Sequence, residues 1–319
     1  DNKGSVIKFD PNSNIIWKKN YYNKGEKKLK PILTLGKGSE TLIVADNISK
    51  YYALNLKDGN LLWSNYNSSP FNSQIKIYKD KFFIIDFNNI LRCFSVKDGT
   101  EFWNIKTSNA FIKSQKKLSI VVVNNVVYFN NSTGDITAVD IASGTMLWQT
   151  PTQNSKIYED TFLLKSSNIV ANKKMIIFSN NKNEFYSLDL KTGNLKWKQN
   201  INSNVQSSIV NNLIFTVTND GFLTIIDSKT GNIIRVTDIF KKENGRSKKG
   251  FLNDKKMNPL YLFDKEIRKE KSNRPKFKPT GFMVGKNSIY LTTDHGKLYV
   301  VDTESGKTSS IIKIDNKKI

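Results

Sequence analysis

One short pattern recurs along this chain, and it constrains the fold more than any other feature. A strand-like run leads to an Asp, Asn or Ser, a Gly follows four residues later, and a Trp follows four residues after that. Four copies carry both Gly and Trp: Ala53–Trp63, Cys93–Trp103, Ala138–Trp148 and Ser187–Trp197. Three weaker copies lack one of the two: Lys8–Trp17 lacks the Gly, and the stretches that end at Arg235 and Ser310 lack the Trp. The chain therefore consists of repeated units.

The period of the repeat indicates the architecture. The motif glycines stand at positions 59, 99, 144, 193, 231 and 306, with spacings of 40, 45, 49, 38 and 75 residues. A period near 40–45 residues with a turn motif and a Trp is typical of β-propeller blades. The longest spacing equals one unit plus an insertion.

Each copy of the repeat is predicted to form four strands and almost no helix. Runs of β-branched and aromatic residues, such as Val126–Phe129 and Leu213–Val217, precede short turn clusters such as Asn219–Gly221. The next strand runs into the glycine turn, and the last strand carries the Trp. We therefore predict an all-β fold, a β-propeller of four-stranded antiparallel blades.

The motif residues have structural roles in this prediction. The Gly supplies the positive φ that a tight hairpin requires. The polar residue four positions earlier bonds the backbone amides of the turn, at Asn55, Asp140, Asp189, Asp227 and Asp302. The Trp on the outer strand packs against the neighbouring blade.

The start of the chain matches the middle of a unit, because Asp1–Gly4 resembles the hairpin Asn219–Gly221. We expect a two-stranded partial blade followed by six four-stranded blades, hence an incomplete ring and a piece of a longer protein. An open sheet edge is a liability that a closed propeller avoids. We treat residues 1–319 as a single propeller domain.

Positive charge is concentrated in one segment. The chain carries a net charge of +22, and residues 240–279 hold 14 Lys or Arg against 5 Asp or Glu. We expect an insertion at about 241–276, too charged to bury a sheet face, with most of its lysines exposed. It is a solvated insertion or a contact for anionic lipid or an acidic partner; nucleic acid is the least favoured partner. The excess of Lys, Asn and Ile, whose codons are AT-rich, leaves a second source of the charge open, namely a bias of the genome without selection for a partner.

Signals for catalysis are weak. Cys93 is the only cysteine, which excludes an internal disulfide, and we expect it in the core. The only histidine, His295, stands between Asp294 and Gly296 in a turn cluster. We find no catalytic triad, metal-ligand cluster or phosphate-binding loop. We therefore predict no catalytic residue, no metal and no cofactor.

The motif Ala-x-Asp-x-x-x-Gly-x-x-x-Trp resembles the pyrroloquinoline-quinone-like propeller repeat. Two groups carry this repeat: quinoprotein dehydrogenases and the BamB family of outer-membrane β-barrel assembly factors. The number and order of motifs, with Phe277–Gly285 running into Ile289–Gly296, resemble the BamB family more closely. That resemblance implies an eight-bladed, non-enzymatic scaffold, lipid-anchored through a segment outside this chain, at the periplasmic face of a Gram-negative outer membrane. Its implied partners are the periplasmic domains of BamA and unfolded outer-membrane proteins.

The resemblance also places partner-binding residues in two interblade loops. The first is Thr107–Lys117, with Phe111, Ile112 and Lys113 at the matching positions. The second is Asn154–Lys165, where Glu159 and Asp160 replace the family's pair of aspartates. Two alternatives remain: a quinone-dependent dehydrogenase, and a propeller that binds anionic surfaces through its basic insertion.

Overall fold

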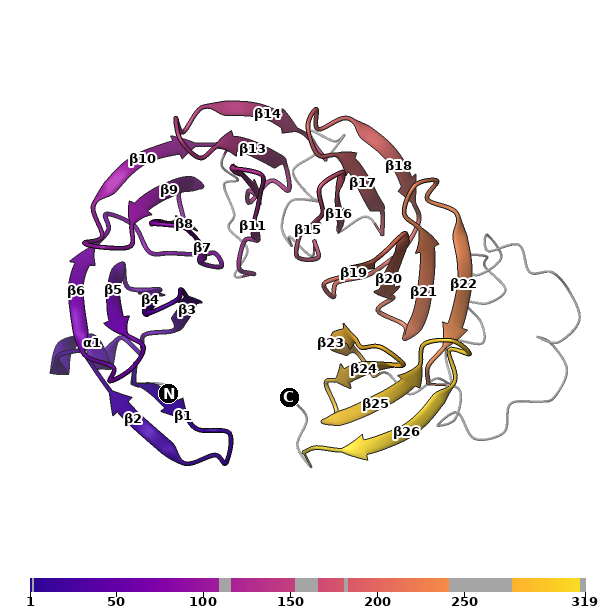
Figure 1. Ribbon diagram of the computed structural model, residues 1–319, viewed down its shortest axis with the longest axis horizontal. Coiled ribbons are helices and arrows are strands. Elements are labelled where there is room, and N and C mark those ends of the chain that lie inside the picture. The colour runs from indigo at the N-terminus through magenta and orange to yellow at the C-terminus, as the bar shows by residue number, and fades with distance from the viewer. Residues whose placement is uncertain (2, 109–115, 153–165, 181–182, 241–276, 316–319) are drawn as a thin grey trace, which may run out of the picture. The chain divides into compact units, whose positions relative to one another are not determined.

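The computed structural model of this protein describes all residues except 2, 109–115, 153–165, 181–182, 241–276 and 316–319. Contacts within the chain divide it into two compact units, residues 1–164 and 165–319. Each unit is a series of antiparallel sheets in which consecutive strands pair with one another. Figure 1 shows the order of the strands within each sheet.

Unit 1 contains four sheets within its described residues. The first has two strands, β1 (Val6–Phe9) and β2 (Ile15–Lys19). The second contains β3 (Leu33–Lys37), β4 (Thr41–Asp46), β5 (Lys50–Asn55) and β6 (Leu61–Tyr66). The third contains β7 (Lys76–Tyr78), β8 (Lys81–Ile85), β9 (Ile90–Ser95) and β10 (Glu101–Lys106). The fourth contains β11 (Ile120–Val123), β12 (Val126–Asn130), β13 (Ile136–Asp140) and β14 (Met146–Thr150).

Unit 2 contains three four-stranded sheets within its described residues. The first contains β15 (Val170–Ala171), β16 (Met175–Ser179), β17 (Phe185–Asp189) and β18 (Leu195–Gln199). The second contains β19 (Ser208–Val210), β20 (Leu213–Val217), β21 (Phe222–Asp227) and β22 (Ile233–Asp238). The third contains β23 (Pro279–Val284), β24 (Ser288–Thr293), β25 (Lys297–Asp302) and β26 (Thr308–Lys313). The predicted two-stranded partial sheet followed by six four-stranded sheets is confirmed for the described residues.

The core of unit 1 lies between successive sheets. Alternate residues of a strand point to opposite faces, so Phe82 and Ile84 pack against the second sheet while Phe83 and Ile85 pack against the fourth. All four side chains are fully buried. Both faces of the middle strands are thus covered, and the exposed side chains lie on the outer strands, on the loops and on parts of the inner strands, such as Leu35 of β3.

Unit 2 is built in the same way. Ile214 and Ile226 join the cluster with Trp197 and the first sheet of this unit. Phe215 and Val217, on the other face, join the cluster of the last sheet. The period-2 alternation therefore gives each middle sheet two apolar faces.

The motif turns have the predicted geometry. The six motif glycines have φ between 69° and 78°, and the Asp140 carboxylate accepts hydrogen bonds from the N–H groups of Ala142 and Ser143. Trp103 packs against Gly144 of the next sheet and donates its indole N–H to the Ile141 carbonyl at 3.0 Å. Trp63 and Trp197 make the equivalent bonds to Val96 and Ser228.

A short helix, α1 (Lys24–Lys28), lies beside β6 and was not predicted (Figure 1). It begins with a capping box, in which Asn23 and Glu26 each bond the other's backbone N–H. The expected insertion at 241–276 lies outside the described residues. Within the part of the chain that the structure describes, no helix has the length and apolar character needed to cross a membrane.

Candidate functional site

The five side chains expected to bind a partner lie outside the residues that the structure describes. Phe111, Ile112 and Lys113 fall within 109–115, and Glu159 and Asp160 fall within 153–165. Their assignment stays a prediction. The residues at the base of each loop are described, and they show how the sheets hold the loop ends.

Asn89 anchors the start of the first loop. This side chain is buried, and its amide N–H groups donate to the Ser108 carbonyl at 2.7 Å and to Ser132 Oγ at 2.5 Å. Thr107, also buried, donates its N–H and its hydroxyl to the Asn89 carbonyl, each at 3.1 Å. The loop therefore leaves β10 from a fixed point between two sheets.

Leu118 anchors the end of the same loop. It is fully buried, pairs with Ser73 in an isolated parallel bridge, and its N–H donates to the Asn72 carbonyl at 2.8 Å. Just before it, burial lowers the pKa of the Lys116 ammonium to about 8. Both ends of the loop are thus held by buried residues of neighbouring sheets.

The second loop has described anchors on both sides. In unit 1, buried Thr152 donates its hydroxyl to the Gly134 carbonyl at 2.8 Å. In unit 2, Ser167 donates its N–H to the Ser179 carbonyl, and its hydroxyl accepts from the Ser179 N–H, both at 2.9 Å. Each bond ties a loop end to a sheet of its own unit.

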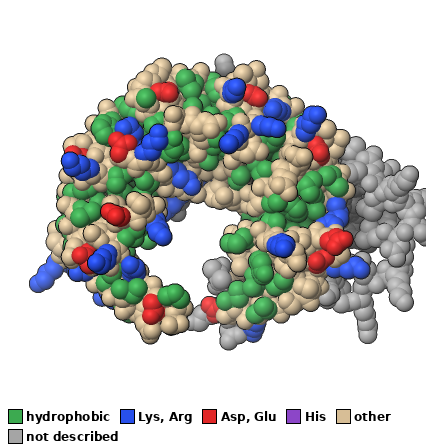
Figure 2. All heavy atoms as spheres, in the orientation of Figure 1, with side chains coloured by type: hydrophobic (Ala, Val, Ile, Leu, Met, Phe, Trp, Pro, Cys, Tyr) green, Lys and Arg blue, Asp and Glu red, His purple; other side chains and the backbone are tan. Residues whose placement is uncertain are grey.

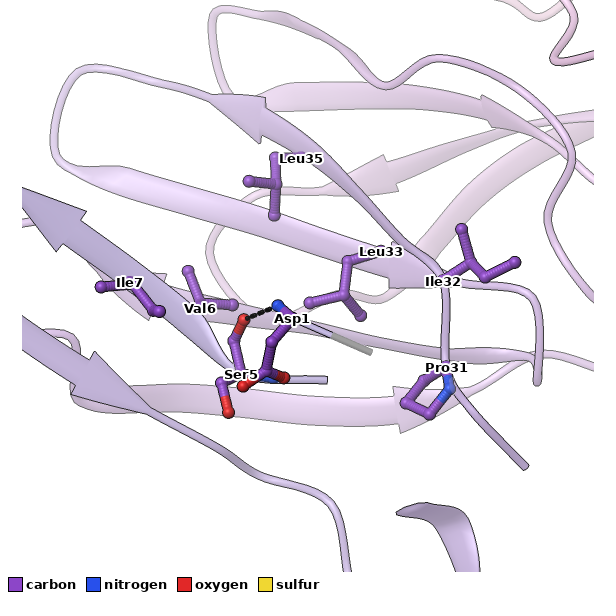
Figure 3. Close-up of a pocket in the computed structure, with 8 residues that line it drawn as sticks. All are labelled: Asp1, Ser5, Val6, Ile7, Pro31, Ile32, Leu33 and Leu35. Atoms are coloured by element: carbon purple, nitrogen blue, oxygen red, sulfur yellow. Dashed lines mark hydrogen bonds between the residues drawn. The ribbon is translucent and has the colours of Figure 1, made fainter. Parts of the chain in front are cut away.

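A pocket of about 470 Å³ lies at the two-stranded sheet of unit 1 (Figure 3). Its lining residues come from β1, β3 and the chain before each: Asp1, Ser5, Val6, Ile7, Pro31, Ile32, Leu33 and Leu35. Figure 3 shows Val6 and Leu33 close to Asp1. Among the described residues β1 pairs only with β2, and Leu35 of β3 is 51% exposed at this pocket.

This pocket is lined mainly by aliphatic side chains. Asp1 is the one charged residue among the eight that line it, and its carboxylate already accepts hydrogen bonds from the N–H groups of Lys3 and Ser5. The other seven residues are aliphatic apart from Ser5. The pocket therefore suits apolar side chains and has no arrangement for acid–base catalysis.

A buried polar cluster joins α1 to the second sheet. Asp46 accepts a hydrogen bond from the Tyr22 hydroxyl at 2.5 Å and from the N–H groups of Ile48 and Lys50. Lys50 reaches Glu26 at 3.0 Å and the Tyr21 carbonyl at 2.7 Å. Burial raises the pKa of the Asp46 carboxyl and of the Tyr22 hydroxyl.

Glu26 is held in the ionised form in the same cluster. Burial opposes ionisation, but hydrogen bonds from Tyr66, the Asn23 N–H and Lys50 outweigh it and lower the pKa of Glu26. The Lys50 ammonium also lies over the rings of Tyr22 and Tyr66. Because Lys50 pairs with Glu26 and the Tyr22 hydroxyl bonds Asp46, the cluster stabilises the position of α1 against the second sheet.

Cys93 lies in the core as predicted. It is fully buried on β9, and burial raises the pKa of its thiol to about 12, which disfavours the reactive thiolate at neutral pH. His295 shares a hydrogen bond with Asp294 at 2.7 Å and packs edge-on against Phe277. In the described part of the chain, no three His, Cys, Asp or Glu side chains gather where they would hold a metal ion.

A second series of capped turns was missed by the sequence analysis. In the hairpin between the second and third strands of a sheet, an Asp, Asn or Thr accepts the N–H of the residue four positions later. The pairs are Asp46–Lys50, Asp86–Ile90, Asn131–Asp135, Asn180–Glu184 and Thr218–Phe222. Asp1 and Ser5 make the same contact just before β1 of the two-stranded sheet. A polar residue directly after each second strand was the available signal.

The sheet order, the capped turns and the Trp contacts define the class: the chain is a β-propeller of four-stranded blades. Solved structures support this fold. BamB from Moraxella catarrhalis matches with a TM-score of 0.72 and 13% identity over 98% of this chain and 83% of that one. The C-terminal WD40 domain of Sif2 matches with a TM-score of 0.68 and 11% identity over 100% and 83%. At these identities the likeness shows the fold alone.

The family follows from the sequence. The family model described as outer membrane protein assembly factor BamB matches residues 2–237, about three quarters of the chain. The chain belongs to this family, as the repeat motif predicted. Among curated proteins, no sequence relative is found.

Proposed function

We propose that this protein is a non-catalytic scaffold of the outer-membrane β-barrel assembly machinery, at the periplasmic face of a Gram-negative outer membrane. The match of the BamB family model to residues 2–237 is the observation that carries this proposal. The quinoprotein dehydrogenases share the repeat, but the matching model describes an assembly factor. The fold adds support, because both faces of the middle sheets are buried and recognition falls to loops and rims.

The binding site in this proposal is formed by the interblade loops 107–117 and 154–165. Phe111, Ile112 and Lys113 of the first loop, with Glu159 and Asp160 of the second, contact the periplasmic domains of BamA. Unfolded outer-membrane proteins are the clients. The buried anchors at Asn89 and Leu118 support this assignment, since fixed loop ends reduce the conformational entropy lost on binding.

The double variant Phe111→Ser with Ile112→Ser tests the proposal. We expect affinity for the periplasmic domains of BamA to fall at least about tenfold, or about 1.4 kcal/mol, with an unchanged thermal midpoint. The matched control is Leu61→Ser with Leu62→Ser, an apolar pair on β6 that is exposed by 41% and 51%. Titration by calorimetry measures the affinity. Equal affinity for the loop variant and wild type, or a lower thermal midpoint, contradicts the assignment.

A further inference from the structure

The segment that joins β2 to β3, residues 20–32, differs from the other segments that make this connection. We call it the basic connector. Two other outer-to-inner connectors are described in full, residues 67–75 and 200–207, and neither contains a charged residue. The basic connector holds four lysines and one glutamate, and it includes α1.

In the basic connector, three lysines point into the solvent and the glutamate points toward the sheet. Lys24, Lys28 and Lys30 are exposed. Glu26 is turned toward the sheet, where Lys50 and Tyr66 bond its carboxylate. The ammonium groups of these three lysines therefore face the solvent. Glu26, the acidic residue nearest to them in the sequence, is already paired with Lys50.

The apolar side chains of the basic connector are also exposed. Leu29 is 63% exposed and Ile32 is 61% exposed. In the neutral connectors apolar side chains are buried: Phe71 and Ile75 in one, Ile201 and Val205 in the other. Figure 2 shows that apolar and Lys or Arg side chains are interleaved on the visible face of unit 1. Exposed aliphatic side chains next to three exposed lysines in the sequence are complementary to a binding surface that is both anionic and partly apolar.

We propose that the basic connector binds the surface of an anionic phospholipid bilayer. Lys24, Lys28 and Lys30 contact the headgroup phosphates, and Leu29 and Ile32 enter the boundary of the acyl chains. Protein interfaces concentrate binding energy in Trp, Tyr and Arg, and the exposed part of this segment has none of these residues. Lysines with long flexible stems around aliphatic side chains suit a fluid anionic surface instead.

This surface uses different residues from the proposed contact with BamA. It lies before β3, whereas the proposed partner loops follow β10 and β14, although Lys117 at the end of the first loop donates a hydrogen bond to Thr34 of β3. Failure of the BamA experiment therefore leaves the lipid proposal intact, and the reverse also holds. The basic connector would fix which part of the protein faces the membrane.

Vesicle binding by the full chain tests the proposal. The probe is a vesicle of phosphatidylglycerol and phosphatidylethanolamine, with phosphatidylcholine as the neutral comparison. Each lysine near an anionic surface is worth about 1 kcal/mol, or about fivefold in affinity. The variant with Lys24, Lys28 and Lys30 changed to Gln is expected to bind the anionic vesicle roughly a hundredfold more weakly.

The control variant removes equal charge elsewhere. Lys57, Lys97 and Lys191 are exposed in the motif turns, and changing these three to Gln is expected to lower affinity only a fewfold. This control is needed because the whole chain carries +22. Equal losses for the two triple variants would mean that binding follows net charge, and the proposal fails. It also fails if the connector variant keeps its vesicle affinity and loses affinity for BamA.

Insertion of Leu29 is tested separately. Leu29→Cys is labelled with an environment-sensitive dye, and Cys93 stays unlabelled because it is buried. We expect the emission of the dye to shift to the blue on anionic vesicles. The same dye at exposed Ala142→Cys in a motif turn is expected to show no shift. Bound protein with no shift at position 29 overturns the proposed insertion.

Discussion

The connectors 20–32 and 67–75 perform the same task in unit 1, since each leads from an outer strand to the inner strand of the next sheet. They differ in how far their apolar side chains are buried. Residues 67–75 are uncharged and bury Phe71, Asn72 and Ser73. Their backbone groups bond Asp46, Ile85 and Leu118, which lie in different strands and loops. Residues 20–32 bury Tyr22 but expose Leu29 and Ile32.

The difference shows that a propeller connector can be part of the core or part of the surface. In the neutral connector, the Phe71 N–H donates to the Asp46 carbonyl and the Gln74 N–H donates to the Leu118 carbonyl. These bonds place the segment between sheets. The basic connector is held at its start by Asn20, Tyr21 and Tyr22 and at α1 by the Glu26–Lys50 salt bridge. Its exposed side chains are Asn23, Lys24, Lys28, Leu29, Lys30 and Ile32.

The largest expected effect comes from the neutral connector. Phe71 packs edge-on against Tyr51 at 5.7 Å between ring centroids and is 6% exposed. Phe71→Ala removes this contact and leaves a cavity, so we expect a loss of about 3–5 kcal/mol in the free energy of unfolding. Urea unfolding measures it. A loss below about 1 kcal/mol would show that this connector is not part of the core.

An intermediate effect is expected for the salt bridge of the basic connector. Glu26→Gln keeps a side chain that can cap α1 but removes the charge opposite buried Lys50. We expect a loss of about 2–3 kcal/mol in the free energy of unfolding at pH 7. The matched control is Glu40→Gln, which removes an exposed carboxylate and is expected to change stability by no more than about 0.5 kcal/mol. Equal losses for the two variants would show that the salt bridge does not stabilise α1.

The pH dependence of this effect has a definite sign. The folded-state pKa of Glu26 is lowered, so its contribution is present above the unfolded-state pKa, near 4.3. The contribution is lost as the pH falls through the lower folded-state pKa. The difference between wild type and Glu26→Gln should therefore shrink on acidification below about pH 4.3. A difference that stays constant with pH would assign the effect to packing.

The smallest expected effect is that of Leu29→Ser. This side chain is exposed, so we expect the free energy of unfolding to change by no more than about 0.5 kcal/mol. Unfolding in urea beside Phe71→Ala gives the comparison directly. A loss above about 1 kcal/mol would place Leu29 in the core and remove the contrast between the two connectors.

The repeat in the sequence predicted most of the fold. Gly59, Gly99 and Gly144 needed positive φ, and the Trp spacing placed an indole against the next sheet, because both are local consequences of a tight hairpin. The partial first sheet followed from the register of Asp1–Gly4 with later hairpins. The family followed from the same motif, and the match over residues 2–237 confirmed it. The partner-binding residues, from Phe111 to Asp160, stay a prediction.

Other features were decided by tertiary structure alone. The pairing of Asp46 with Tyr22, and of Lys50 with Glu26, joins residues 24 positions apart. No periodicity in the sequence specifies these contacts, because they depend on where α1 meets the sheet. The same holds for the connectors: Phe71 and Leu29 are both apolar residues between strands, and only the packing of neighbouring sheets buries one and exposes the other. Local patterns determine strands and turns, whereas burial depends on which surfaces the folded chain brings together.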